Sequence, residues 1–116
     1  MILPNRVSLS INATNKLRNL KAQTGLTPNI LSRIAITKAL ETTTSLNNAG
    51  VADAEGQVLS KDVLFGEHDL VYEVLIKQYI EENQISEPVQ NVIAALIEIG
   101  VHKIGHTKNI QQIVTS

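Results

Sequence analysis

Between Asn5 and Ile11, hydrophobic and polar residues alternate one by one along the chain. The apolar positions are Val7, Leu9 and Ile11. A period of two predicts a β-strand with one apolar face and one polar face. The polar face would carry Arg6, Ser8 and Ser10.

The period then changes to that of a helix. Ala13, Leu17 and Leu20 share one helical face, which predicts a first helix ending near Thr24. We expect Gly25 at its C-terminal cap, because glycine accepts the left-handed backbone needed there. The expected N-cap is Asn12 or Thr14.

Thr27-Pro28 is a strong start signal for a second helix, with Thr as the N-cap and Pro in the first turn. This helix is expected to end near 42–45, where several Thr and Ser residues weaken it. Its predicted apolar stripe consists of Ile30, Leu31, Ile34, Ala35 and Leu40. The amides of Asn29 and Ile30, at its positive end, are a candidate phosphate contact.

The pattern from residue 47 to residue 66 is mixed, with turn residues between short apolar runs. Short extended pieces or a small hairpin are expected at Val58, Leu59, Val63, Leu64 and Phe65. A helix is expected over 67–82, with an apolar face made of Leu70, Val71, Val74, Leu75 and Tyr79. A last long helix is expected to begin at Ser86-Glu87-Pro88 with Ser86 as its N-cap. Its apolar residues go almost all the way round, so burial on more than one side is predicted; they are Val89, Val92, Ile93, Leu96, Ile97, Ile99 and Val101.

Charge divides the chain into two parts. The first 40 residues carry basic residues and no acid, and every acid lies from Glu41 onward. The basic residues are Arg6, Lys16, Arg18, Lys21, Arg33 and Lys38. The formal charge is therefore +6 before Glu41 and −7 after Leu40, which together give the overall −1. We expect one domain over residues 1–116, with a basic half at 1–45 and an acidic half at 46–116.

The order strand, helix, helix in a basic segment is that of the ribbon–helix–helix DNA-binding fold. The predicted fold class is therefore mainly α: a ribbon–helix–helix-like N-terminal unit extended by two further helices and a short irregular or hairpin segment. A lone strand is unstable, so the strand would pair with that of a second subunit. All six basic residues are candidate DNA-binding residues, and Arg6, Ser8 and Ser10 could reach bases or phosphates from the strand.

Other chemistry is weakly represented. The chain has no cysteine, so it offers no thiolate for metal, persulfide or nucleophilic chemistry, and it fits a cytoplasmic protein. No apolar run reaches the length of about 18 residues needed to span a membrane, so no membrane partner is expected. His102 and His106 have helical metal-ligand spacing, but Lys103 replaces the glutamate of the metalloprotease motif and Gly105 interrupts the helix. No catalytic residue, metal or cofactor is therefore expected.

Several segments along the chain have a specific order and spacing. They are Leu3-Pro4-Asn5-Arg6, Lys16-Leu17-Arg18-Asn19-Leu20-Lys21, Thr24-Gly25-Leu26-Thr27-Pro28-Asn29-Ile30, Arg33 with Ala35, Gly66-Glu67, Leu75-Ile76-Lys77-Gln78-Tyr79 and Gly100-Val101. Together they resemble the DndE family of DNA sulfur modification proteins. The resemblance implies an accessory subunit, without catalysis of its own, of the machinery that replaces a backbone oxygen of DNA with sulfur. It also implies a tetramer, binding to duplex DNA with a preference for nicks through Lys16, Arg18 and Lys21, and work with sulfur-transferring and ATPase-like subunits.

Two alternatives remain open from the residues alone. One is a ribbon–helix–helix transcriptional regulator or antitoxin that reads a specific operator. The other is an oligomerisation module whose basic half binds an acidic protein. The length of the acidic half, about 75 residues in a one-domain chain, favours a multi-protein role over a simple regulator.

Overall fold

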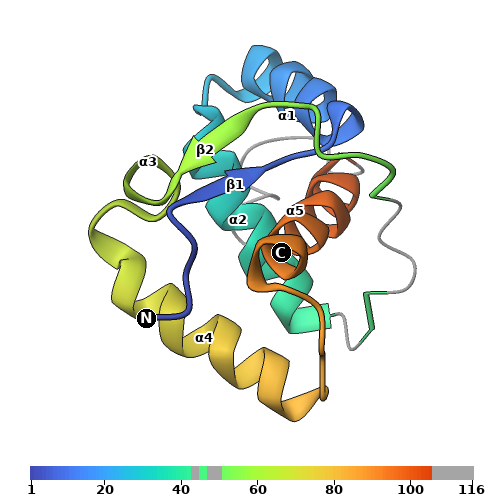
Figure 1. Cartoon of the computed structure of the whole chain (residues 1–116). Helices are drawn as coiled ribbons and strands as arrows, with labels where there is room; N and C mark the ends of the chain where they lie inside the picture. The colour runs from blue at the N-terminus through green and yellow to red at the C-terminus, as the bar shows by residue number, and fades with distance from the viewer. Residues whose placement is uncertain (43–44, 47–50, 106–116) are drawn as a thin grey trace.

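The computed structural model describes residues 1–42, 45–46 and 51–105. Its elements, in chain order, are β1 (Arg6–Ser8), α1 (Ile11–Thr24), α2 (Pro28–Thr42), β2 (Val58–Ser60), α3 (Lys61–Phe65), the 3₁₀ turn η1 (Gly66–His68), α4 (Asp69–Glu82) and α5 (Val89–Ile104). Helices dominate, and the two short strands form one small sheet near the N-terminus (Figure 1). The predicted mainly helical fold class, with a strand–helix–helix unit at its start, is confirmed.

The first strand is shorter than the alternation predicted. It ends at Ser8, and α1 already begins at Ile11. Ser10, with an extended backbone, is the N-cap, and its Oγ accepts a hydrogen bond of 3.0 Å from the amide of Ala13. The prediction of Asn12 or Thr14 as the cap was therefore wrong, because Ser10 already satisfies that amide. The other end is as predicted, since Gly25 adopts a left-handed φ of 78° and its amide donates to the carbonyl of Lys21.

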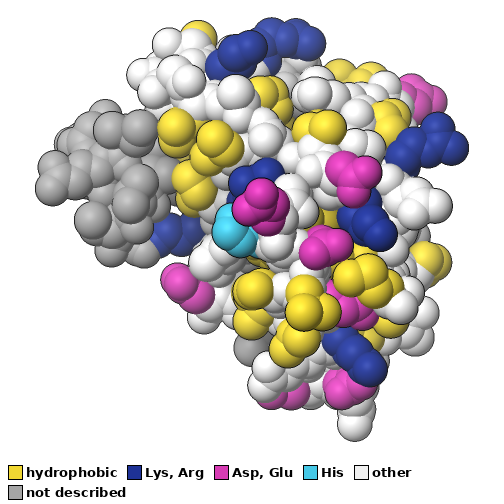
Figure 2. Space-filling view, turned by 90° about the vertical axis from the view of Figure 1, so that its left-hand side faces the viewer, with side chains coloured by type: hydrophobic (Ala, Val, Ile, Leu, Met, Phe, Trp, Pro, Cys, Tyr) yellow, Lys and Arg dark blue, Asp and Glu magenta, His cyan; other side chains and the backbone are white. Residues whose placement is uncertain are grey.

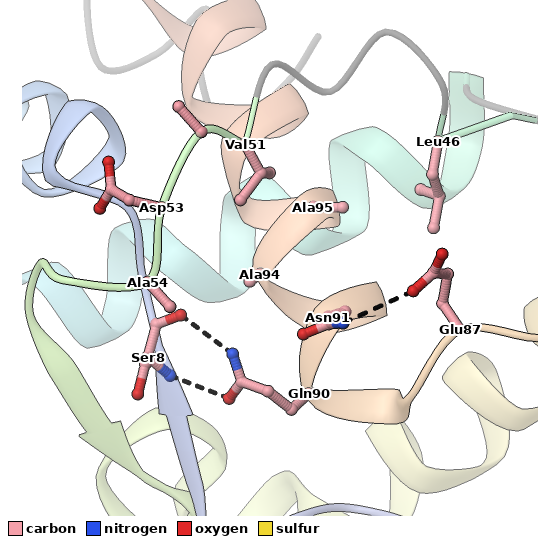
Figure 3. A pocket seen from close by; sticks show the side chains of 11 residues that line it. Ser8, Leu46, Val51, Asp53, Ala54, Glu87, Gln90, Asn91, Ala94 and Ala95 are labelled. Atoms are coloured by element: carbon pink, nitrogen blue, oxygen red, sulfur yellow. Dashed lines mark hydrogen bonds between the residues drawn. The ribbon is translucent and has the colours of Figure 1, made fainter.

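β1 finds its partner strand within the same chain. It pairs antiparallel with β2, in the register Arg6–Ser60, Val7–Leu59 and Ser8–Val58. On its other edge, the Gln90 side chain of α5 accepts from the Ser8 amide (2.9 Å) and donates to the Ser8 carbonyl (3.0 Å), as Figure 3 shows. The prediction that β1 would pair with a second subunit was therefore wrong. A short strand needs a second strand to satisfy its backbone hydrogen bonds. Here β2, some fifty residues further along the same chain, is that second strand.

The middle segment is only partly extended. Val58 and Leu59 lie in β2, as expected, but Val63, Leu64 and Phe65 are helical and belong to α3. No local hairpin forms in the described part of this segment, since β2 pairs with β1 instead.

α5 is the central helix of the core. From Val92 to Glu98 every residue is buried, and α1, α2 and β1 all pack against it. The prediction that this helix is buried on more than one side is confirmed, with cover from its own chain. Its start was misplaced: Pro88, not Ser86, occupies the N-cap position.

The contact between α2 and α5 is very close. A Cβ added at Gly100 would lie 2.0 Å from the carbonyl oxygen of Ala35, so only glycine fits at this crossing. The buried stripe of α2 is also turned slightly from the predicted one. It consists of Leu31, Ser32, Ala35, Ile36 and Ala39, whereas Ile30 is 38% exposed.

α4 turns the opposite face to the core from the one predicted. It buries Ile76 and Tyr79, while four of the five residues of the expected buried face are exposed. These are Leu70, Val71, Val74 and Leu75. Both sides of this helix are apolar, so the hydrophobic period alone could not identify the side that packs.

Candidate nucleic-acid interface

The helix α1 carries three of the six predicted DNA-binding residues. At about 100° per residue, Lys16 and Lys21 lie about 140° apart around the helix axis, with Arg18 on the outer side. Arg18 and Lys21 are exposed and Lys16 is half-buried. Figure 2 shows basic side chains at the top of the molecule, where Figure 1 has α1. The three cations are thus spread over a broad outer surface and do not converge on one point.

These cations are not neutralised by carboxylates in the described part of the chain. Arg18 Nη1 donates to the Oδ1 of Asn15 at 3.3 Å, one turn earlier on the same helix. Lys16 Nζ lies 3.4 Å from Nδ1 of His102 on α5. Both partners are uncharged or basic, so the positive charge of α1 remains available to an anion.

The start of α1 is fixed by a buried acid. Glu98 of α5 is only 3% exposed. Its carboxylate accepts hydrogen bonds from the Ser10 hydroxyl and, at 2.9 Å, from Asn12 Nδ2. A carboxylate at this end also complements the positive end of the helix dipole. This contact ties the basic helix to the central helix of the core.

A second contact comes from the segment just before β2. The Thr14 hydroxyl donates to the Ser10 carbonyl (2.8 Å) and accepts from the Gln57 amide (2.8 Å). Gly56 lies so close that an added Cβ would be 2.2 Å from Thr14 Oγ1. Residues of the acidic half therefore pack directly on α1.

Asp53, also from the acidic half, accepts a 3.0 Å hydrogen bond from the Ile11 amide. With Ser10 it occupies amides in the first turn of α1. That end of the helix is therefore acidic, and the exposed cations begin about a turn further along. A DNA contact through α1 would involve its middle and C-terminal part.

The two candidates on α2 have different surroundings. Arg33 Nε donates to the carbonyl of Leu64 (2.6 Å) and Nη2 to that of Val63 (3.3 Å), so its guanidinium holds α3 against α2. Lys38 lies five residues further along α2 and is half-buried. The prediction of DNA contact at both remains untested, and Arg33 has a structural role that the sequence did not reveal.

The candidate DNA-binding residues on and next to β1 also differ in their exposure and contacts. Arg6 is exposed on β1. Ser8 is bound on its backbone by Gln90, and Ser10 is 2% exposed in the α1 cap. Ser10 therefore cannot reach DNA, contrary to the expectation for the polar face of the strand. Arg6 and the half-buried Ser8 side chain therefore remain as strand candidates.

A hollow of about 720 Å³ lies beside β1 and α5 (Figure 3). Its charged lining side chains are the acids Asp53 and Glu87, among small apolar residues such as Ala94 and Ala95. Negatively charged carboxylates repel the negatively charged phosphates of DNA, so this hollow does not suit the DNA backbone.

Two residues important to the site were missed in the sequence. Glu98 stands alone among isoleucines, as Ile97-Glu98-Ile99, and an isolated acid in an apolar run signals a buried, hydrogen-bonded carboxylate. Asp53 gave no such signal, because its contact depends on the fold of a loop.

Among the residues that the structure describes, no group of three or more His, Cys, Asp and Glu side chains is arranged to hold a metal ion. No described helix is long and apolar enough to cross a membrane. His106, one of the pair considered above, lies outside the described residues.

Comparisons with known proteins gave consistent results. The family model "DNA sulphur modification protein DndE" matches residues 6–112. The crystal structure of DndE from Escherichia coli B7A, involved in DNA phosphorothioation modification, is 30% identical with a TM-score of 0.76, over 90% of this chain and 99% of that one. A mutant DndE involved in DNA phosphorothioation is 28% identical with a TM-score of 0.72, over 88% and 98% of the two chains. No curated protein matches.

Proposed function

Because the chain belongs to the DndE family of DNA sulphur modification proteins, we propose that it is the DNA-binding accessory subunit of a DNA phosphorothioation system. It binds duplex DNA through phosphate contacts from α1. Lys16, Arg18 and Lys21 make the central contacts. Arg6 and Lys38 are flanking candidates, and Arg33 contributes mainly by holding α3.

This proposal rests on two properties of α1, its positive charges and its fixed orientation. Its three cations have no carboxylate partner in the described residues, and the buried Glu98 fixes the helix to the core. A rigid helix with spread positive charge suits a row of phosphates, whose contacts position a protein without reading sequence. The system modifies the DNA backbone, so backbone recognition fits its chemistry.

Preference for nicked duplex is part of the proposal and follows from the family resemblance. A nick makes duplex DNA easier to bend, and lower deformation energy favours a protein that binds by shape. Such a preference would be independent of sequence.

We assign the sulfur chemistry to partner subunits. Persulfide transfer and iron–sulfur ligation both use cysteine thiolates, and this chain has none. The chain would hold DNA for sulfur-transferring and ATPase-like subunits. It would act as a homo-oligomer, with a tetramer as the expected state, in the cytoplasm.

The regulator alternative loses its structural basis. A ribbon–helix–helix regulator reads bases through a ribbon of two strands, one from each subunit. Here β1 is occupied by β2 on one edge and by Gln90 on the other. We therefore do not carry that function forward.

The test is a competition binding assay with nicked, intact and single-stranded DNA of one sequence, repeated with a scrambled sequence. We expect tightest binding to nicked duplex in both sequences. Tight binding to one intact sequence only would revive a regulator, and no binding at low salt would assign the basic surface to a protein partner.

A matched pair of variants locates the contact. Lys21→Gln should weaken binding to all duplexes, whereas Lys61→Gln, at the start of α3 in the acidic half, should not. Equal effects of the two substitutions would mean that only net charge matters, and α1 would lose its assignment.

A further inference from the structure

The exposed side of α4 is unusually apolar. We call the set Leu70, Val71, Val74 and Leu75 the α4 face; these side chains are 65%, 56%, 57% and 40% exposed. Figure 2 shows hydrophobic side chains gathered in the lower half of the molecule, where Figure 1 has α4. Contiguous exposed apolar side chains on a small protein typically mark an interaction surface.

The orientation of α4 is fixed by its other side. Ile76 and Tyr79 are buried in the core, and the Glu73 carboxylate accepts hydrogen bonds from the amides of Ile2 (2.8 Å) and Leu3 (3.1 Å). Rotating the helix to bury the α4 face would break these contacts. The face can be covered only by something outside the chain described.

The spacing of the α4 face is self-complementary. Residues 70 to 75 read Leu-Val-Tyr-Glu-Val-Leu, so the four residues of the α4 face occupy the same positions in both directions. If two copies of α4 lie antiparallel about a two-fold axis between Tyr72 and Glu73, Val71 of each copy is level with Val74 of the other. A two-fold interface needs this reciprocity, in which each surface contacts its own copy.

The charges on α4 favour the antiparallel arrangement. Glu67 lies in the 3₁₀ turn just before α4, Asp69 is the first residue of the helix, and Lys77 lies in its second half. With the axis between 72 and 73, Lys77 of one copy is level with residues 67–69 of the other. A parallel pairing would instead bring the Glu81-Glu82 pairs of both copies together, where like charges repel.

From this geometry we propose that the α4 face is a homodimer interface, in which α4 packs antiparallel against α4 of a second copy across a two-fold axis. The inference deepens the oligomer that forms part of the proposed function, by naming its surface and symmetry. It does not depend on DNA binding. In a tetramer, this contact would be one of the two-fold interfaces.

Cross-linking tests the geometry, and the absence of native cysteine makes it site-specific. Val74 of one copy would lie about 4–5 Å along the helix axis from Val74 of the other, but Gln78 about 16 Å from its counterpart, at about 1.5 Å per residue. Val74→Cys should therefore cross-link into dimers with a short thiol reagent, and Gln78→Cys should not. Cross-linking of both would indicate a parallel pairing, and cross-linking of neither would exclude the face; either result overturns the proposal.

The second experiment measures oligomeric state by sedimentation of the whole chain. Val74→Glu should lower the mass of the assembly at least two-fold at a given concentration. The control Ile30→Glu, at another exposed apolar position where an acid suits the first turn of α2, should leave it unchanged. An unchanged mass in Val74→Glu, with circular dichroism unchanged, would contradict the proposal.

Binding of nicked DNA by Val74→Glu separates the two proposals. Loss of mass with retained, weaker DNA binding supports both, because a smaller assembly combines fewer basic surfaces. A lower mass in Val74→Glu, when neither the variant nor the parent chain binds nicked DNA, would support the α4 interface and reject the proposed function.

Discussion

Glu98 has an unusual place for a carboxylate, because it lies inside the core and accepts hydrogen bonds from Ser10 and Asn12. A buried acid is tolerated only when its oxygens are satisfied. The hydrogen bonds that satisfy Glu98 come from the cap of α1. The same residue therefore contributes to stability and fixes the orientation of the basic helix.

We predict that Glu98→Gln destabilises the protein by about 1–3 kcal/mol, since the amide nitrogen would face a donor and leave one group unpaired. Urea denaturation measures the change. The exposed Glu81→Gln is the control and should stay within about 0.5 kcal/mol of the parent chain. An equal, small effect for both would mean that the Glu98 hydrogen bonds add little.

Glu73 gives a prediction about pH. Burial alone would raise the pKa of its carboxyl, but hydrogen bonds from the amides of Ile2 and Leu3 outweigh this and lower the pKa overall. A lowered pKa in the folded state stabilises the fold above the usual value for Glu, about 4.3. That stabilisation is lost as pH falls through the lowered value.

The loss of stability between pH 5 and pH 3 should therefore be smaller in Glu73→Gln than in the parent chain. Urea midpoints at the two pH values give the comparison. Equal losses would show that the ionised Glu73 does not stabilise the N-terminal segment.

At the scale of elements, the crossing of α2 and α5 is the tightest contact in the core. We predict that Gly100→Ala is destabilising by about 1–3 kcal/mol or more through overpacking, because its Cβ would meet the Ala35 carbonyl oxygen at 2.0 Å. The control is Gly105→Ala, whose Cβ would lie 3.3 Å from the Val101 carbonyl oxygen and 3.4 Å from that of His102. Thermal unfolding distinguishes them, and a neutral Gly100→Ala would require the two helices to separate easily.

Elements with local signals were predictable from the sequence, and those with distant partners were not. Gly25 and Thr27-Pro28 correctly predicted the end of α1 and the start of α2, because these signals depend on neighbouring residues. The pairing of β1 with β2 and the buried side of α4 depend on residues far along the chain. For the site, the basic residues of α1 could be identified, but the buried acid that fixes the helix and the role of Arg33 needed the fold.

At the scale of the whole molecule, the two charge halves are not two separate bodies, because the Asp53–Gln57 segment packs on α1. DNA binding should still be strongly salt-dependent. With three or four phosphates neutralised by each protomer, log affinity should fall with log salt at a slope of about −3 to −4. In Lys21→Gln the slope should be shallower by about 1; an unchanged slope would remove Lys21 from the interface.

The position of α5 late in the chain has a consequence for synthesis on the ribosome. α1 and α2 emerge early, but the helix that covers them, and Glu98 that fixes α1, emerge only after about 90 residues. Until then the parts of α1 and α2 that α5 covers stay exposed, and β1 has no partner strand before β2 is made. A nascent chain therefore cannot complete its core step by step; folding is a late, collective event that follows the exit of α5. Premature termination before α5 would release a fragment with exposed apolar surface, in which α1 is no longer fixed by Glu98.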